Sequence, residues 1–447
     1  MNLPEELLQS LEGLPGFDRN EFVSVHQWPQ SLTSIRLNPR KPCRNCLELV
    51  QEAVPWSKWG YYLKERPSFT FDPEFHAGCY YVQEASSMFL EQALTQSVDL
   101  SQPLRILDLS AAPGGKSTNI ESLIAEGSLL VSNEVIRGRA KILNDNIVRW
   151  GARNAVVTSS DPAVFSTLPQ YFDVLVVDAP CSGSGLFRRD EDAILEWSES
   201  HVQLCSQRQQ RIVADAWPAL KGGGILIYST CSYSQRENED ILEWLQRELG
   251  AEAVSLRLDE QWNIEPFRGG YRFWPHRVKG EGFFLAVMRK PGQTQSLSYR
   301  FERTMEQLSA NERKQVAAWM NTENFELMKR DREILAWPES VSEEMSIVSA
   351  KLRVVYSGVA AGEMARDKFI PAHALAMSGL VNASVPRKIL DDDQAIRYLR
   401  KDELQLTLPK GWQLVTTRSG HPLGWINVLS SRLNNYYPKQ LRILKDR

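Results

Sequence analysis

The 447-residue sequence contains no long hydrophobic run. No stretch approaches the roughly 18 consecutive apolar residues that a membrane-spanning helix needs. Its first residues, MNLPEELLQSLEG, carry acids early and only a short apolar stretch, whereas a secretory signal has a basic start and a longer apolar segment. We therefore expect a cytoplasmic protein that has no membrane partner.

A surplus of positive charge is absent as well. Lysine and arginine number 52 against 55 aspartates and glutamates, which gives a net charge of -3. Nucleic-acid binding is not excluded, because it depends on where basic residues cluster rather than on their sum. Hydrophobic residues make up 43% of the chain, an ordinary share for a globular protein, and the length predicts roughly three domains.

Cysteine is scarce, with six residues in the whole chain: Cys43, Cys46, Cys79, Cys181, Cys205 and Cys231. Without a secretory signal, these cysteines are expected to be reduced thiols. Cys43 and Cys46 form a CxxC pair, but no second CxxC and no pair of histidines lies at zinc-finger spacing. We interpret the pair as two ordinary thiols in a turn and expect no metal site.

Both common nucleotide-binding motifs are missing. The segment AAPGGKS (111–117) ends like a P-loop, but a P-loop has a glycine five positions before its last glycine, and Ser110 stands there. A dinucleotide-binding GxGxxG is missing too. What remains is a tight glycine turn before a helix, where backbone amides can approach a ligand.

Short apolar runs alternate with helical stretches between about residues 76 and 292. This pattern predicts a doubly wound α/β domain whose parallel sheet is covered on both faces. The expected strands are 104–109, 129–134, 155–161, 173–180, 225–231 and 283–290. The expected helices include 137–150, 200–220 and 237–249.

Polar or reactive side chains follow five of these strands. They are Asp108 with the glycine turn, Glu134, Asp161, Asp178 with Cys181, and Cys231. Ligands of open α/β sheets bind at the carboxyl ends of the strands, so these groups are expected to share one cleft. Glu134 lies about 20 residues after the glycine turn, where an acid binds ribose hydroxyls in such folds. An adenosine ligand without a phosphate-binding loop indicates S-adenosylmethionine.

The two cysteines that follow strands, in DAPCSGSG (178–185) and YSTCSY (228–233), suit methylation of a pyrimidine. A thiolate that adds to carbon 6 makes carbon 5 nucleophilic enough to take a methyl group, and the thiolate is then expelled. Asp178 lies three residues before Cys181 and can hold the polar edge of the ring. A lone cysteine is more often a small core residue. The pattern does not decide which of the two thiols is the nucleophile.

Several segments resemble one enzyme family, the Sun/Fmu-type RNA cytosine-5 methyltransferases. The matching segments are LDLSAAPGGKS (107–117), DAPCSGSGLFRRD (178–190), YSTCSYSQRENE (228–239), YVQEASSM (81–88) and WPHRVKGEGFF (274–284). Near the C-terminus, FIPAHALAMSG (369–379) and PLGWINVLSSRLNNYYPKQLR (422–442) resemble the RsmF-like bacterial branch, which methylates cytosine in 16S ribosomal RNA.

The resemblance implies a role for each residue of the motifs. It assigns the nucleophile to Cys231, release of the product to Cys181 and contact with the target base to Asp178. The residues implied in binding S-adenosylmethionine are Ser110, Ala111, Ala112, Pro113, Gly114, Gly115, Lys116, Glu134, Asp161 and Asp178. Ser110 departs from the cysteine, alanine or methionine that is frequent in the family, but it keeps the residue small.

The resemblance also implies domains on both sides of the Rossmann-like methyltransferase domain. We expect an RNA-positioning domain at 1–75, the methyltransferase domain at 76–292, a linker and mainly helical region at 293–368, and a PUA-like RNA-binding domain at 369–447. We expect the part of the chain that follows the methyltransferase domain to be an α+β region that ends in this PUA-like domain. The basic residues expected to contact RNA are Arg36, Arg188, Arg189, Arg432 and Lys439, with Arg40, Lys41, Arg44, Arg442, Lys445 and Arg447 nearby and Tyr436 and Tyr437 interleaved.

Two alternatives remain open at this point. A transfer-RNA cytosine-5 methyltransferase would use the same chemistry, although the long C-terminal part disfavours it. A catalytically silent RNA-binding assembly factor would need neither cysteine. We favour an S-adenosylmethionine-dependent enzyme, a monomer that acts on 16S rRNA or the small-subunit particle, whose target cytosine must be unpaired or flipped out of its helix.

Overall fold

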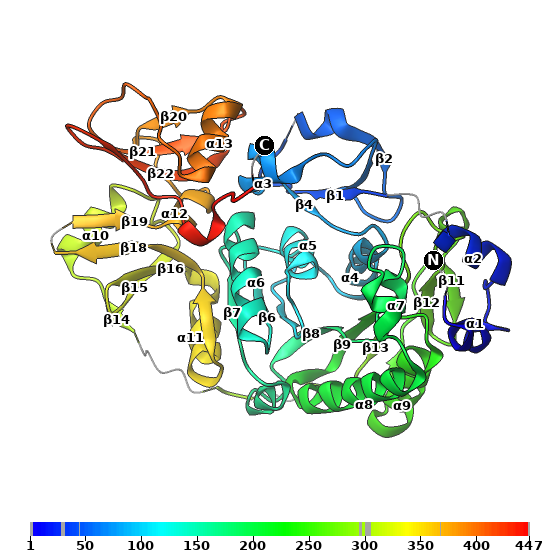
Figure 1. Ribbon diagram of the computed structural model, residues 1–447. Helices are drawn as coiled ribbons and strands as arrows, with labels where there is room; N and C mark the ends of the chain where they lie inside the picture. Colours follow the sequence, from blue (N-terminus) through cyan, green and yellow to red (C-terminus); the bar gives the residue numbers. More distant parts are fainter. Residues whose placement is uncertain are drawn as a thin grey trace.

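The computed structural model describes residues 3–27, 32–43, 45–294, 297–299, 305–366 and 368–445 (Figure 1). Its largest part is a ten-stranded sheet with the order β11-β12-β13-β9-β8-β5-β6-β7-β17, in which β10 also pairs with β13. The strands are β5 Arg105–Asp108, β6 Leu129–Asn133, β7 Ala155–Thr158, β8 Phe172–Asp178, β9 Leu220–Thr230, β10 Glu252–Ala253, β11 Glu265–Phe267, β12 Gly270–Phe273, β13 Phe283–Arg289 and β17 Val354–Ser357.

The middle of this sheet is parallel and almost entirely buried. Strands β7, β6, β5, β8 and β9 run in one direction, and their apolar side chains form the largest core of the molecule. The flanking pairs β9–β13 and β7–β17 are antiparallel. The parallel pairing that the sequence predicts is therefore limited to the five central strands of the ten-stranded sheet. The fold class predicted from the alternating pattern is confirmed.

Helices cover both faces of the sheet. Helices α4 Leu90–Ser97, α5 Gly115–Leu123 and α6 Arg137–Trp150 contact one another, and α8 Glu199–Ala216 contacts α9 Glu239–Leu249. Crossovers between parallel strands are right-handed, so helices that lead to opposite edges of the sheet lie on opposite faces. In the strand order β9-β8-β5-β6-β7, the chain builds outward in one direction from β5 and in the other from β8. The order thus reverses between β5 and β8, and an open α/β sheet binds its ligand at such a point.

The N-terminal residues form two separate units. Helices α1 Glu5–Leu11 and α2 Arg19–Gln27 pack against the domain that contains the ten-stranded sheet, where the ring centroids of Phe22 and Tyr233 are 5.0 Å apart. A four-stranded sheet follows, with the order β2-β3-β1-β4. Its elements are β1 Ser34–Leu37, β2 Val50–Ala53, β3 Gly60–Leu63, β4 Tyr80–Val82 and the short helix α3 Pro73–His76.

The region expected to be mainly helical is largely a sheet, which corrects that prediction. Five strands pair in the order β14-β15-β16-β18-β19. They are β14 Glu306–Gln307, β15 Phe325–Arg330, β16 Glu333–Pro338, β18 Val359–Ala365 and β19 Lys368–Pro371, accompanied by α10 Ala310–Ala317 and α11 Ser342–Lys351. The turn between β15 and β16 uses Asp331 at a φ of 57° instead of glycine, so the usual sequence signal of a hairpin is missing.

The C-terminal part is a small α+β unit. It contains α12 His373–Met377, β20 Arg387–Ile389, α13 Asp392–Arg400, β21 Gly411–Thr416, β22 Pro422–Val428 and β23 Leu433–Asn435. Strands β21 and β22 form a hairpin, as the sequence predicts. This unit lies beside the N-terminal sheet (Figure 1), and residues of both share one hydrophobic core.

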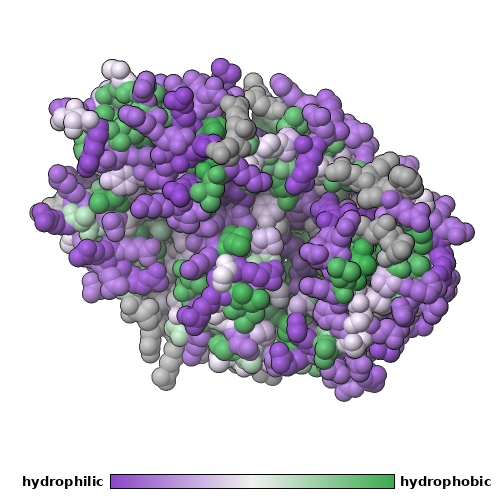
Figure 2. All heavy atoms as spheres, viewed as in Figure 1, coloured by the Kyte–Doolittle hydropathy of each residue, from purple (hydrophilic) through white to green (hydrophobic). Residues whose placement is uncertain are grey.

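Two features of the whole molecule bear on its chemistry. The expectation that Cys43 and Cys46 are reduced thiols is wrong, because they form a disulfide in a turn that brings their Cα atoms within 5.4 Å. No helix in the described part of the chain is long and apolar enough to cross a membrane. Hydrophilic side chains cover most of the face shown in Figure 2, and hydrophobic residues form small groups on it.

Candidate active site

The glycine turn connects β5 to α5 at the point where the strand order reverses. Gly114 precedes the helix with a φ of 116°, a left-handed conformation that favours glycine, and the Ala112–Pro113 peptide bond is cis. The first amides of α5 have no partner within the helix, so they can bind a ligand in front of it.

Asp178 connects this helix to the neighbouring strands. Its Oδ2 lies 2.7 Å from Nζ of Lys116 in the first turn of α5, and its Oδ1 accepts a hydrogen bond from Ser229 of β9 at 2.8 Å. The Asp178 side chain is still 38% exposed. Its carboxylate is therefore held in place and remains accessible to a ligand.

A cleft opens beside Asp178 and the glycine turn. It is lined by Tyr81, Val82, Gln83, Glu84, Ser87, Ser110, Ala111, Ala112, Pro113, Gly115, Lys116 and Asp178. Six of the seven residues predicted for the cofactor loop thus border it, together with Asp178. The other residues that line the cleft lie between positions 81 and 87. In the sequence, only the family resemblance indicates that this segment matters. No periodicity or spacing indicates that this segment folds back over the glycine turn.

Glu134 and Asp161 follow the next two strands, as predicted, but neither lines this cleft. Glu134 is buried; its Oε1 accepts a hydrogen bond from the amide of Ile136, and its Oε2 lies 3.5 Å from Arg139. Asp161 is exposed and caps the short 3₁₀ helix Pro162–Thr167. Their predicted contacts with a cofactor stay predictions.

Asp108, the last residue of β5, has an unused hydrogen-bonding atom. The carboxyl is fully buried; Oδ2 accepts a hydrogen bond from Ser117 at 2.7 Å, and Oδ1 has no partner within the described chain. Burial raises the pKa of Asp108 to about 7. A buried acceptor without a donor is costly, so this oxygen is suited to a ligand donor or a water molecule.

The two cysteines at the strand ends lie in contact. Strands β8 and β9 are parallel neighbours in which Asp178 is paired with Ser229, so the loops that follow them emerge side by side. The sulfurs of Cys181 and Cys231 are 3.1 Å apart. The hydrogen bond between them, followed by burial, raises the pKa of the Cys181 thiol well above its usual range. Cys181 is therefore expected to keep its proton near neutral pH.

The loops that carry the cysteines are bound to one buried carboxylate, Glu237. Its Oε1 accepts hydrogen bonds from the amide of Ser182 at 2.8 Å and from Gln209 at 3.2 Å. Its Oε2 accepts from the hydroxyls of Ser182 and Ser232, both at 2.5 Å. Ser182 and Ser232 directly follow Cys181 and Cys231, so Glu237 fixes both thiols. Sequence reasoning gave Glu237 no role.

We expect Glu237→Gln to lower the free energy of unfolding by about 2–4 kcal/mol, because an amide offers only one acceptor oxygen to four converging donors. Misplaced thiols would also lower methylation by about 10²-fold. Chemical denaturation and a methyl-transfer assay test both effects. The matched control is Glu243→Gln, since Glu243 forms an exposed ion pair with Arg268. Full activity of Glu237→Gln would show that the carboxylate does not position the thiols.

The structure contradicts RNA contact by Arg36. Its side chain is fully buried, donates to Gln83, Gly115 and Thr118, and lies over the ring of Trp150. Burial lowers the pKa of Arg36 to about 9. Arg36 therefore fastens the N-terminal sheet to the start of α5. In the strand sequence SIRL (34–37), a basic residue between two apolar ones suggests a side chain that faces solvent. The sequence does not show that α5 covers that face of the strand.

Some of the other residues predicted to contact RNA are buried, and others are accessible to solvent. The prediction is wrong for Arg188, whose side chain is 5% exposed and donates to the carbonyl of Gly280, and Lys41 is also buried. Arg189, Arg432 and Lys439 are accessible to solvent. Tyr436 is exposed and Tyr437 buried. Arg44 and Arg447 lie outside the described residues.

Comparison with known proteins agrees with this geometry. A family model described as 16S rRNA methyltransferase RsmB/F matches residues 96–289. The chain is 30% identical to ribosomal RNA small subunit methyltransferase F of Pectobacterium atrosepticum, over 98% of this chain and 96% of that protein. The chain belongs to the RsmB/F family. Its relative from Enterobacter sp. strain 638 carries the same name, with 31% identity over 98% of this chain and 95% of that protein.

The RsmF branch of the family is shown by both ends of the chain. Residues 3–85 match the N-terminal domain of 16S rRNA methyltransferase RsmF, and residues 389–443 match the RsmF PUA domain. The resemblance seen in the sequence is thereby confirmed, and the protein is a 16S rRNA methyltransferase.

Two solved structures share the fold. A methyltransferase homolog from Pyrococcus horikoshii is 27% identical, with a TM-score of 0.52 over 64% of this chain and all of that chain. NSun6 from the same organism, solved with SFG, is 20% identical, with a TM-score of 0.54 over 65% of this chain and 99% of that chain. The second likeness concerns the fold alone.

Proposed function

We propose that this RsmF-type enzyme uses S-adenosylmethionine to methylate carbon 5 of a cytosine in 16S rRNA through a covalent cysteine–cytosine intermediate. The observation that carries the proposal is the pair of thiols 3.1 Å apart at the ends of β8 and β9. The two loops that carry the thiols follow Asp178 of β8 and Ser229 of β9, which are hydrogen-bonded to each other, and the Asp178 carboxylate contacts the first turn of α5. Covalent catalysis on a pyrimidine needs such a thiol near the methyl donor.

Within this pair, Cys231 is the proposed nucleophile. The raised pKa of Cys181 keeps a proton on that sulfur, and its S–H can donate to the sulfur of Cys231. A thiol that keeps its proton is a poor nucleophile, which favours Cys231 over Cys181 as the attacking sulfur. Its addition to carbon 6 activates carbon 5, which takes the methyl group.

The second half of the reaction restores the aromatic ring. A water molecule takes the proton from carbon 5, the electron pair of that C–H bond restores the double bond, and the bond between carbon 6 and sulfur breaks so that Cys231 leaves as a thiolate. We assign Cys181 to this release, because its thiol lies in contact with the departing sulfur. Asp178 is assigned to the polar edge of the base, since its carboxylate remains partly exposed at the end of β8, three residues before Cys181.

The residues of the cleft suit the proposed cofactor, which supplies the methyl group when bound. The glycine turn presents free amides, Lys116 and Asp178 lie at its edge, and Oδ1 of Asp108 has no donor within the described chain. Glu134 and Asp161, after the two adjacent strands, are the proposed partners of the adenosine part. These positions follow the general rule for open α/β sheets.

RNA binding is proposed for the accessible basic residues. Arg189 follows the Cys181 loop, and Arg432 and Lys439 lie in the C-terminal unit that matches the RsmF PUA domain. Exposed lysines and arginines contact phosphates and position an RNA, while the flipped base is read in the active site. The N-terminal sheet is proposed to position the RNA by its shape.

Bisulfite mapping of 16S rRNA tests the function. In a strain that lacks this gene, we expect at least one cytosine to lose the protection that the parent strain shows. A plasmid copy of the gene restores protection, and a copy with Cys231→Ala does not. If every 16S cytosine reacts alike in both strains, methylation of cytosine in this RNA is not the function of the protein.

A further inference from the structure

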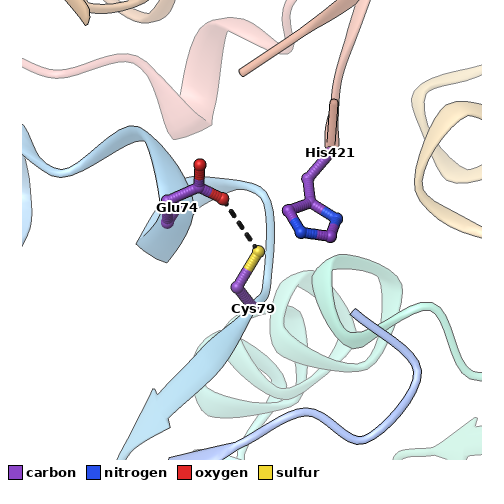
Figure 3. Close-up of side chains that lie close together, drawn as sticks. All are labelled: Glu74, Cys79 and His421. Atoms are coloured by element: carbon purple, nitrogen blue, oxygen red, sulfur yellow. Dashed lines mark hydrogen bonds between the residues drawn. The ribbon is translucent and has the colours of Figure 1, made fainter. Parts of the chain in front are cut away.

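Three potential metal ligands meet where the N-terminal sheet contacts the C-terminal unit. Glu74 lies in α3, Cys79 in the residues before β4, and His421 in the turn of the β21–β22 hairpin (Figure 3). One ligand atom from each side chain lies within 4.8 Å of the other two. Glu74 and Cys79 are only five residues apart, whereas His421 comes from a distant segment of the chain, so only the tertiary fold completes the cluster.

Two of the three side chains in this cluster are buried. Cys79 is fully buried, Glu74 is 7% exposed, and His421 is partly open to solvent. The thiol of Cys79 donates a hydrogen bond to Oε2 of Glu74 at 3.1 Å. A buried carboxylate with a weak thiol donor is poorly compensated, whereas a cation would satisfy both groups. The open side at His421 gives an ion a way in.

The surrounding charges are compatible with a cation. Lys41 is the nearby basic side chain that acts on Cys79, but its Nζ donates to the carbonyls of Ala77 and Arg149. Asp72 adds a further negative charge near the thiol.

We propose that Glu74, Cys79 and His421 bind one zinc ion. A set of oxygen, sulfur and nitrogen ligands is typical of zinc, and three protein ligands leave a fourth position for water. On binding, the metal–sulfur bond replaces the S–H bond of Cys79, and the proton passes to solvent. The ion would tie the N-terminal sheet to the C-terminal hairpin, and so fix the relative position of the two domains proposed to contact RNA.

Metal analysis of the purified full-length protein tests the site. After dialysis against zinc and removal of the excess, we expect about one equivalent of zinc per chain. Cys79→Ser and His421→Ala each lower this to about a tenth or less. His421→Ala keeps the test valid if Cys79→Ser folds poorly, because His421 lies at the surface. The matched control is Cys205→Ser, a buried cysteine on α8 that should keep full zinc content.

Cobalt provides an independent readout of the thiolate. Titration with Co²⁺ should produce a sulfur-to-cobalt absorption band and release one proton per ion, and Cys79→Ser should lose both. The double variant Cys43→Ser/Cys46→Ser should keep them. If zinc or the band is lost in this double variant and persists in Cys79→Ser, or if the unmodified chain binds no zinc, the proposed site is wrong. None of these measurements depends on the methylation chemistry.

Discussion

Alanine in place of Cys231 should lower the rate of 16S rRNA methylation by at least about 10³-fold, because it removes the thiol that we propose adds to carbon 6 of the cytosine. We propose that this side chain acts only in the chemical step, so RNA affinity should change by less than about twofold. Transfer of a labelled methyl group and equilibrium RNA binding measure the two quantities.

Cys205→Ala is the matched control for this experiment. Cys205 is a buried cysteine on α8 that does not line the cleft, so its replacement removes a thiol to which we assign no role in the reaction. This variant should keep its activity below its unfolding temperature. Full activity of Cys231→Ala would remove Cys231 from the mechanism, whatever the behaviour of the control.

Alanine in place of Cys181 should let the covalent protein–RNA complex accumulate, whereas alanine in place of Cys231 should prevent its formation. The first half of the reaction needs only Cys231, so the enzyme should still attack the cytosine and then fail to release it. A protein–RNA complex that survives denaturation should therefore accumulate, visible as a band of low mobility on a denaturing gel. Turnover should fall at least about tenfold.

The double variant Cys181→Ala/Cys231→Ala controls for other crosslinks and should give no such band. The two cysteines have exchanged roles if the stable complex forms with Cys231→Ala and not with Cys181→Ala. The sulfur contact of 3.1 Å makes this a sharp comparison, because either thiol is close enough to replace the other in space.

The central strands and the strand-end site could be predicted from the sequence for a physical reason. Runs such as DVLVVD and ILIYST are apolar without alternation, which a strand buried on both faces requires. Parallel strands place their carboxyl ends at one edge, so Asp178, Cys181 and Cys231 had to lie near one another. The pairing register of β8 and β9 and the distance between the two sulfurs came only from the structure.

What escaped prediction depends on contacts between segments far apart in the chain. Arg36 reads as a basic residue next to a turn, yet α5 packs over it and takes up its donors. Glu237 lies six residues after Cys231, and no local pattern shows that its carboxylate turns back to both cysteine loops. The CxxC pair drew attention to Cys43 and Cys46, whereas the cluster of metal ligands joins Cys79 to the distant His421.

The central claim is that the sulfur of Cys231 bonds to carbon 6 of a cytosine in 16S rRNA. Peptide-level mass spectrometry of the complex trapped by Cys181→Ala tests it most directly, after nuclease and protease digestion. We predict one cytidine nucleotide attached to the peptide that contains Cys231, at Cys231 itself. A nucleotide attached to any other residue, or a different base attached to Cys231, would contradict the account.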